Sequence, residues 1–157
     1  MNELLPTFEG LILREFEQSD RQMVSDFFDA MGGESRAFFD RGGSNKKNGL
    51  KKWDGDNSSK VDFAAILDGQ MVGYLFLFDM NTGVPWLGIG IADEFKGMKL
   101  GRILMNHAEN YCRSLGKGGI LLMTHVANLR GQGLYVRMGY EHIGKHETGE
   151  ELYILRF

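Results

Sequence analysis

Cysteine, proline and long apolar runs are scarce in this sequence of 157 residues. The single cysteine, Cys112, excludes an internal disulfide, which favours a reducing compartment. No run approaches the about 20 apolar residues that a membrane-spanning helix needs, so we expect no membrane partner. The first residues, MNELLPTFEG, lack the basic and apolar segments of a secretory leader. We therefore expect a cytoplasmic protein.

An excess of positive charge is also missing. The chain has 18 Lys and Arg against 21 Asp and Glu, a formal net charge of −3. Domains that bind nucleic acid are usually basic, so no nucleic-acid partner is expected. The length predicts one domain over residues 1–157. Glycine, in contrast, is abundant with 22 residues, which indicates many tight turns or close approaches of the backbone.

The hydrophobic pattern predicts strands and helices that alternate in the second half of the chain. Alternation of this kind favours parallel neighbours, whereas the Asp68-Gly69 turn predicts an antiparallel hairpin. We predict an α/β domain with one central mixed sheet, mostly antiparallel, of six to seven strands and helices on both faces. The expected strands are 10–16, 61–67, 71–78, 85–92, 119–126, 140–144 and 151–157, and the clearest expected helix follows residue 100.

The segment EFKGMKLGRILMNHAE, residues 94–109, joins a glycine-rich loop to this helix. Exposed N–H groups of such a loop, together with the positive end of a helix, can bind an anion. Three basic residues flank the two glycines and would strengthen the binding of a polyphosphate. An ordinary turn that begins a helix explains the same spacing equally well.

Two familiar phosphate motifs are excluded. The loop has no Gly-Lys-Ser or Gly-Lys-Thr and is therefore not the loop of nucleoside triphosphatases. Gly88-Ile89-Gly90 lacks the third glycine of a dinucleotide fingerprint.

Two segments together resemble the GNAT N-acetyltransferase superfamily. That family has Gln or Arg, two variable residues, Gly, one variable residue and then Gly or Ala; here Lys96-Gly97-Met98-Lys99-Leu100-Gly101 stands in that place. Lys96 and Lys99 depart from the usual residues. The family also often has Asn, then Leu-Tyr and Gly-Phe or Gly-Tyr, and Asn128, Leu134-Tyr135 and Gly139-Tyr140 match in order and spacing.

The resemblance implies a GNAT-like fold and an acetyl-CoA co-substrate bound by a core of residues 85–144. In such proteins the fourth strand diverges from the fifth and its backbone pairs with the pantetheine arm. The loop N–H groups bind the pyrophosphate, Asn128 bonds to the pantetheine arm, and Tyr135 protonates the departing thiolate. The implied binding residues are Ile89, Gly90, Ile91, Lys96, Gly97, Met98, Lys99, Leu100, Gly101, Arg102, Asn128 and Tyr135.

The resemblance further implies transfer of an acetyl group to a primary amine of a small molecule or peptide, by direct attack in a ternary complex. Residues 32–60 are expected to shape the acceptor site. Many relatives carry a Glu on the fourth or fifth strand that acts as the general base, but here Met123 stands where some of them have it. The candidate general bases are Asp93 and Glu94, at the end of the fourth strand, and His125, at the end of the fifth, with Glu94 and His125 preferred. A base acting through ordered water is an equal alternative.

Plainer interpretations accompany each of these residues. Tyr135 could be a half-buried helix aromatic, and His107 is expected to be a hydrogen-bonded histidine at the core boundary. His142 and His146 lack the motif of a zinc helix, so no metal is expected. The alternative for the whole chain is a non-catalytic module that binds acyl-CoA as a sensor or regulatory subunit. A homodimer is compatible with the resemblance.

Overall fold

The computed structural model describes residues 8–31, 59–97 and 99–157. Most of the expected acceptor region, residues 32–58 of 32–60, lies outside the described residues, and so does Met98. The strands are β1 (Ile12–Glu15), β2 (Val61–Leu67), β3 (Gln70–Phe78), β4 (Trp86–Ile91), β5 (Gly119–Thr124), β6 (Glu141–Lys145) and β7 (Glu151–Arg156). The helices are α1 (Arg21–Asp29), α4 (Leu100–Ser114) and α5 (Leu129–Arg137), with short 3-10 helices η1 (Gln18–Asp20) and η2 (Asp93–Phe95).

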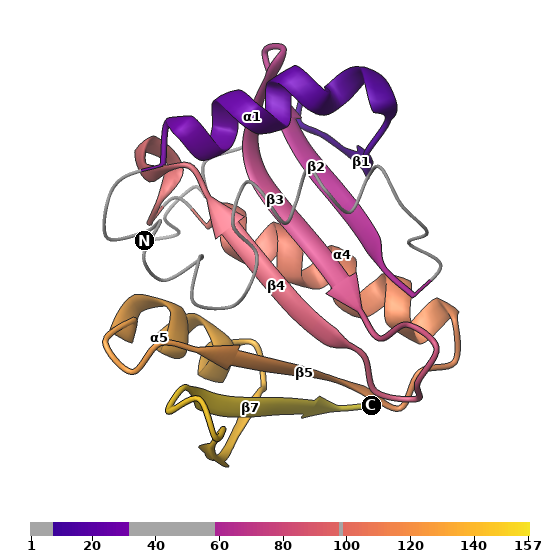
Figure 1. Cartoon of the computed structure of the whole chain (residues 1–157), viewed down its shortest axis with the longest axis vertical. Helices are drawn as coiled ribbons and strands as arrows, with labels where there is room; N and C mark the ends of the chain where they lie inside the picture. The colour runs from indigo at the N-terminus through magenta and orange to yellow at the C-terminus, as the bar shows by residue number, and fades with distance from the viewer. Residues whose placement is uncertain (1–7, 32–58, 98) are drawn as a thin grey trace, which may run out of the picture.

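One seven-stranded sheet runs through the domain in the order β1-β2-β3-β4-β5-β7-β6 (Figure 1). All neighbours are antiparallel except β4 and β5, which are parallel. The prediction of a mixed, mostly antiparallel sheet is therefore confirmed. The strand–helix–strand unit at 119–144 does not make β5 and β6 neighbours, because β7 inserts between them and pairs with both.

Helices cover both faces of this sheet, as predicted. On one face, α1 buries Val24, Phe27 and Phe28 against a cluster that includes Tyr74 and Phe76 of β3. This arrangement follows from the strand pleat, since alternate residues of β3 point to opposite faces.

On the other face, α4 buries Leu100, Leu104, Ala108 and Cys112. These positions recur at helical spacing and form one apolar stripe. Tyr135 of α5 belongs to the same cluster, so α4 and α5 share this face. Burial raises the pKa of the Cys112 thiol to about 11, which suits a packed apolar residue and opposes a thiolate.

His107 corrects one expectation. Its ring packs edge-on against Phe63 with centroids 4.6 Å apart. Its Nε2 atom is buried and has no hydrogen-bond partner among the residues that the structure describes, so it is not the satisfied histidine we expected. Burial lowers its pKa, because the charged ring would lose hydration.

Candidate active site

The central strands β4 and β5 pair at a single position within the described sheet. Trp86 is the partner of Leu121, and the Leu121 N–H donates to the Pro85 carbonyl at 2.9 Å. By contrast, β3 and β4 pair along their full length, from Phe78–Trp86 to Gly73–Ile91. Beyond the Trp86 pair the two strands diverge (Figure 1). The divergence implied by the family resemblance is therefore present.

One edge of β4 presents its backbone to this gap. The Ala92 N–H donates to the Val72 carbonyl at 2.9 Å, which shows which residues bond toward β3. Residues of an antiparallel strand alternate between bonding to one neighbour and to the other side. By that alternation Ile89 and Ile91 direct their N–H and C=O groups toward β5, whereas Gly90 directs its own toward β3. Two of the three expected pantetheine-binding residues thus face the gap.

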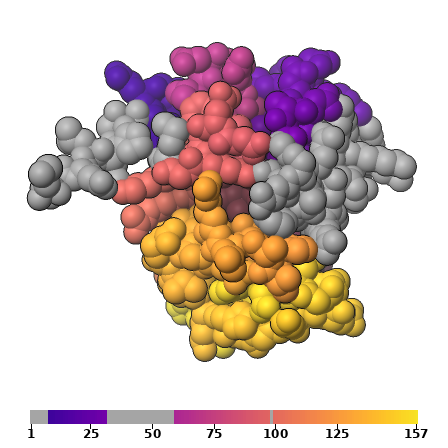
Figure 2. All heavy atoms as spheres, turned by 90° about the vertical axis from the view of Figure 1, so that its left-hand side faces the viewer, coloured from indigo at the N-terminus to yellow at the C-terminus, as the bar shows by residue number. Residues whose placement is uncertain are grey.

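A cleft of about 900 Å³ opens where the strands diverge. Figure 2 shows the molecule hollowed between the salmon segment that follows β4 and the orange segment of α5. The cleft brings together most of the residues expected to bind the co-substrate. Those that line it are Ile89, Gly90, Ile91, Lys96, Gly97, Lys99, Leu100, Gly101, Arg102, Asn128 and Tyr135.

The loop before α4 has an unusual backbone. Gly97 and Lys99 both have positive φ, +75° and +67°. Glycine adopts this conformation freely, whereas a lysine there costs about 1 kcal/mol. No described side chain caps α4, so its first N–H groups are left for another partner. This is the geometry of an anion site, although it does not identify the anion.

Glycine at position 101 allows α4 and α5 to approach closely. A Cβ atom there would lie 2.9 Å from Cδ2 of Leu134 on α5. This contact explains why a residue without a side chain stands at position 101, although that position lies within α4. The approach places the starts of both helices on the same cleft.

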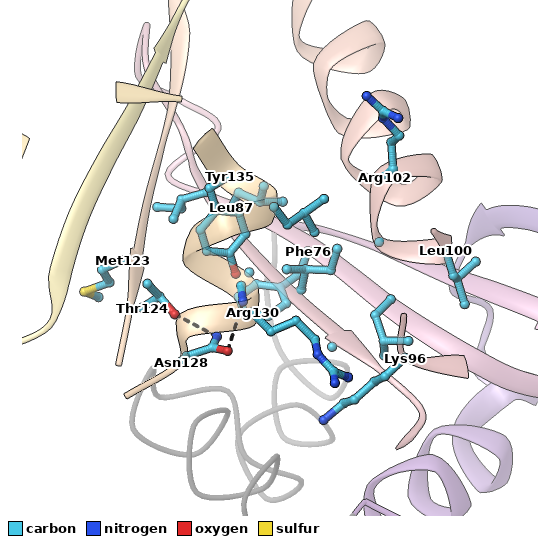
Figure 3. Close-up of a pocket in the computed structure, with 18 of the residues that line it drawn as sticks. Phe76, Leu87, Lys96, Leu100, Arg102, Met123, Thr124, Asn128, Arg130 and Tyr135 are labelled. Carbon is cyan, nitrogen blue, oxygen red and sulfur yellow. Dashed lines mark hydrogen bonds between the residues drawn. The ribbon is translucent and has the colours of Figure 1, made fainter. Parts of the chain in front are cut away.

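Two basic residues of the cleft were not among the expected site residues. Arg130 and Arg137 of α5 line it together with Lys96, Lys99 and Arg102. Figure 3 draws Lys96, Arg102 and Arg130 of this set. The sequence could have indicated this pair, because Arg130 and Arg137 are seven positions apart and residues at that spacing lie on the same face of a helix. Lys96 also lies 3.2 Å from the Asp93 carboxylate. The five cations favour a ligand with several negative charges.

Asn128 begins α5 and uses its side chain within the protein. Its Oδ1 accepts the Gly131 N–H at 3.2 Å, and its Nδ2 donates to Thr124 Oγ1 at 2.9 Å (Figure 3). A Cβ at Gly131 would lie 2.4 Å from Asn128 Nδ2. The glycine therefore makes room for the amide that caps the helix. We expected Asn128 to bond to a pantetheine arm. In the structure each of its polar atoms makes one bond within the protein and keeps one further donor or acceptor position.

Tyr135 lies on the second turn of α5 with 6% of its surface exposed. Burial raises the pKa of its phenol to about 12, and a hydrogen bond with Thr124 offsets part of the rise. The rings of Tyr140 and Tyr153 pack beside it, with centroids 6.3 and 5.9 Å away. The phenol keeps its proton at neutral pH and lines the cleft, so it can donate a proton there.

Of the three candidate general bases, Asp93 lines the cleft, whereas the two preferred ones, Glu94 and His125, do not. Glu94 is exposed and lines a separate pocket of about 460 Å³ beside α1. His125 does not line the cleft, and its Nδ1 accepts the Ala127 N–H at 3.0 Å. Met123, in contrast, does line the cleft.

A buried acid, Glu150, also lines the cleft, and the sequence interpretation missed it. Glu150 has 6% of its surface exposed and immediately precedes β7. Its position at the start of a predicted strand was the available signal, since strand ends commonly carry site residues.

Neither a metal site nor a membrane span is found in the described part of the chain. No three His, Cys, Asp or Glu residues of residues 8–31, 59–97 and 99–157 lie together as a metal would require. His142 instead contacts Glu151, and His146 contacts Thr148. In the same ranges no helix has the length and apolar character needed to cross a bilayer.

Comparison with known proteins agrees with this geometry. Residues 21–140 match the family model described as the acetyltransferase (GNAT) family. Streptothricin acetyltransferase from Streptomyces lavendulae is 30% identical over 111 residues, which is 69% of this chain and 58% of that protein. The match thus spans less than two thirds of that relative's length.

Solved structures share the fold at lower identity. The GNAT domain of S. lividans PAT superposes with a TM-score of 0.81 and 15% identity, covering 99% of this chain and all of that domain at 100%. Spermidine N-acetyltransferase from Vibrio cholerae, in complex with CoA and spermine, gives a TM-score of 0.72 and 18% identity, covering 93% and 95% of the two chains.

Proposed function

This chain belongs to the GNAT acetyltransferase family, and we propose that it transfers an acetyl group from acetyl-CoA to a primary amine of a small molecule or peptide. The proposal includes direct attack of the amine in a ternary complex. Its main support is the single cleft that joins a cationic loop, an unpaired strand edge and a buried phenol. The named activities of the streptothricin and spermidine enzymes support an amine as acceptor.

In this proposal different cleft residues bind different parts of the co-substrate. The N–H groups at the start of α4 bind the pyrophosphate, with the helix dipole and the flanking cations adding attraction. Ile89 and Ile91 pair with the amides of the pantetheine arm through the β4 backbone. Asn128 serves this site indirectly, by capping α5 and thereby positioning Tyr135.

The chemistry follows from the acceptor and the leaving group. An alkyl ammonium has a pKa near ~10.4 and must lose a proton before its nitrogen can attack. The nitrogen then forms a bond to the thioester carbonyl carbon and releases a second proton to solvent, while a β4 N–H stabilises the oxyanion that develops. When the C–S bond breaks, Tyr135 donates its proton to the sulfur and regains one from solvent. Holding both substrates in one cleft supplies much of the remaining rate.

Turnover against a panel of amines tests the proposal. The protein is mixed with acetyl-CoA and primary amines, and free CoA is measured with a thiol reagent. Release of CoA that depends on an amine, with an acetylated amine found by mass spectrometry, is the expected result. Absence of transfer to every amine in a broad panel would refute the proposed activity.

A non-catalytic module that binds acyl-CoA is the second candidate. It is favoured by the position of Glu94 and His125 outside the cleft and by Met123 in place of an acid. Thermal stabilisation by CoA without any transfer would support this module over the enzyme. Loss of both stabilisation and transfer would exclude the two together. A cytoplasmic location and a homodimer belong to the proposal on the same footing, as predictions from the sequence.

A further inference from the structure

The sheet divides the cleft into two sides. Leu87 and Leu122 point to the face that α4 and α5 cover. Because side chains alternate along a strand, Trp86 and Met123 point to the opposite face. Phe76 belongs to the core on that opposite face. The cleft therefore has a side toward α4 and a side toward α1.

The side toward α1 has an aromatic wall. Phe78 stacks on Trp86 with centroids 6.1 Å apart and an interplanar angle of 9°. The rings of Phe76 and Phe78 are also stacked, with centroids 6.0 Å apart. All three rings line the cleft. A wall of this kind suits an alkyl chain and the cationic groups that it carries.

Charge is distributed unequally between the two sides. The described lining has five cations, all in the loop before α4 or on the helices α4 and α5, namely Lys96, Lys99, Arg102, Arg130 and Arg137. It has two carboxylates, Asp93 and Glu150. The Asp93 carboxylate lies beside Lys96 at the loop, whereas Glu150 lies in the turn between β6 and β7.

The turn between β6 and β7 holds Glu150 near the aromatic wall. The His146 N–H donates to the Glu150 carbonyl at 2.8 Å, and the Gly149 N–H donates to the His146 carbonyl at 2.9 Å. The His146 ring packs edge-on against Trp86, with centroids 6.4 Å apart. The turn is thus closed by its own backbone and anchored on the first residue of β4.

The Glu150 carboxylate lacks a cation among the described residues. The Thr148 hydroxyl donates to its Oε1 at 3.5 Å. The one buried cation near the aromatic wall, Lys60, pairs with Asp62 at 2.8 Å. The other oxygen of Glu150, Oε2, has no hydrogen-bond partner among the described residues and is not one of the fully buried polar atoms, so it is accessible from the cleft. A cationic group that enters the cleft could therefore pair with it, and the low exposure of the residue would strengthen that pair.

We propose that Glu150 binds a second cationic group of the acceptor, one that is not acetylated. The inference rests on the proposed function and names its substrate class: diamines and other amines with a further positive charge. The reacting nitrogen must become neutral before it attacks, so it cannot remain the partner of a buried carboxylate. A second ammonium keeps its charge throughout, while the methylene chain between the two groups lies along Phe76, Phe78 and Trp86.

Matched amines test this selectivity. Putrescine is compared with butylamine, and cadaverine with pentylamine, so that each pair shares its chain and differs mainly in the second charge. Wild-type protein is compared with Glu150→Gln, which keeps the side-chain shape and removes the charge. Glu147→Gln is the control, because Glu147 is an exposed acid in the same turn. Glu150→Asp, which keeps the charge, tests whether the carboxylate or the shape matters.

We expect wild-type protein to favour the diamine of each pair. Glu150→Gln should raise KM for the diamines by about 10- to 100-fold, the usual effect of losing a hydrogen bond to a charged group, with kcat nearly unchanged. KM for the monoamines should stay the same, Glu147→Gln should behave as wild type, and Glu150→Asp should keep part of the preference. An equal loss of kcat for diamines and monoamines would overturn the inference, because Glu150 would then act on the reacting nitrogen. Unchanged selectivity would also overturn it.

Calorimetry separates this inference from the proposed function. Putrescine is titrated into the CoA-saturated protein and into CoA-saturated Glu150→Gln, whose folding is checked by thermal unfolding. Binding to wild type that weakens about 10-fold or more in the variant supports the inference even if no acetyl transfer occurs. Equal binding to both proteins, or no binding to wild type, refutes it whether or not the enzyme acetylates other amines.

Discussion

The helices α4 and α5 both begin at the cleft, but they begin differently. The last residue before α4 is Lys99, in a left-handed conformation, and no described side chain caps the helix. The last residue before α5 is Asn128, whose side chain accepts the Gly131 N–H. One helix therefore presents free N–H groups to the cleft, and the other has satisfied its own.

This difference suggests separate tasks. The open start of α4 suits an anionic ligand, because unsatisfied N–H groups and the helix dipole point at it. The closed start of α5 suits a helix whose purpose is to hold Tyr135 in position. The five predictions below test this division, from the largest effect to the smallest.

Replacing Tyr135 by Phe should have the largest effect, because it removes only the proton that the proposal assigns to α5. We expect kcat to fall by about 100-fold or more, as is typical for loss of a general acid. Affinity for CoA, measured by calorimetry, should be nearly unchanged. A variant with wild-type turnover would show that Tyr135 is not the acid.

The pH dependence sharpens this test. Burial raises the pKa of Tyr135 to about 12, so the phenol stays protonated well above neutral pH. The ratio of wild-type to Tyr135→Phe turnover should therefore be constant between about pH 6 and about pH 9. A ratio that falls within that range would indicate a phenol with a lower pKa.

Replacing Gly101 by Val should weaken binding at α4. Even a Cβ atom would lie 2.9 Å from Leu134, and the larger side chain would force the two helices apart. We expect affinity for CoA to fall about 10-fold and the free energy of unfolding to fall by about 1–3 kcal/mol. Asn106→Val, at an exposed position of the same helix, is the control and should leave CoA affinity intact. Equal affinity in both variants would contradict the close-approach explanation.

Replacing Asn128 by Ala should cost about 1 kcal/mol of stability, the usual value of a helix cap. Asn128→Asp retains the oxygen that accepts from Gly131 and should retain most of that stability in urea unfolding. If Asn128 acts only through the cap, both variants should keep CoA affinity within a few-fold. A loss of CoA affinity in both variants, beyond the loss of stability, would instead assign the amide to the pantetheine arm.

Replacing Lys99 by Gly should have the smallest effect and the opposite sign. Relief of the positive φ should outweigh the added freedom of the unfolded chain, and raise the free energy of unfolding by up to about 1 kcal/mol. Lys99→Gln keeps the strain and removes the charge, so it separates the two contributions. Stability that is unchanged or lower in Lys99→Gly would show that the left-handed backbone is not strained.

Local signals in the sequence predicted most elements. The Asp68-Gly69 turn forms with positive φ at both residues, 52° and 76°, as a tight hairpin between β2 and β3 requires. The apolar stripe predicted α4. Glycine is unfavourable inside a helix, but Gly131 of α5 makes room for the Asn128 cap and Gly101 of α4 makes room for Leu134. These features succeeded because each depends on residues close together in the chain.

The remaining features depend on long-range contacts. Insertion of β7 between β5 and β6 is decided by pairing across the sheet, which no local pattern encodes. The recruitment of Arg130, Arg137 and Glu150 to one cleft likewise required the fold, since none belongs to the motifs of the family resemblance. The acceptor region predicted at 32–60 lies almost wholly outside the described residues and stays a prediction.

The single pairing between β4 and β5 leaves a gap in the sheet that a bound substrate could bridge. The sheet behaves as two panels, one of four strands and one of three, joined by one rung at Trp86 and Leu121. An acyl-CoA bound as proposed would lie along the open seam and supply the missing rungs. Its amides would then complete the backbone pairing between β4 and the rest of the sheet, so the sheet would be fully paired only while acyl-CoA is bound.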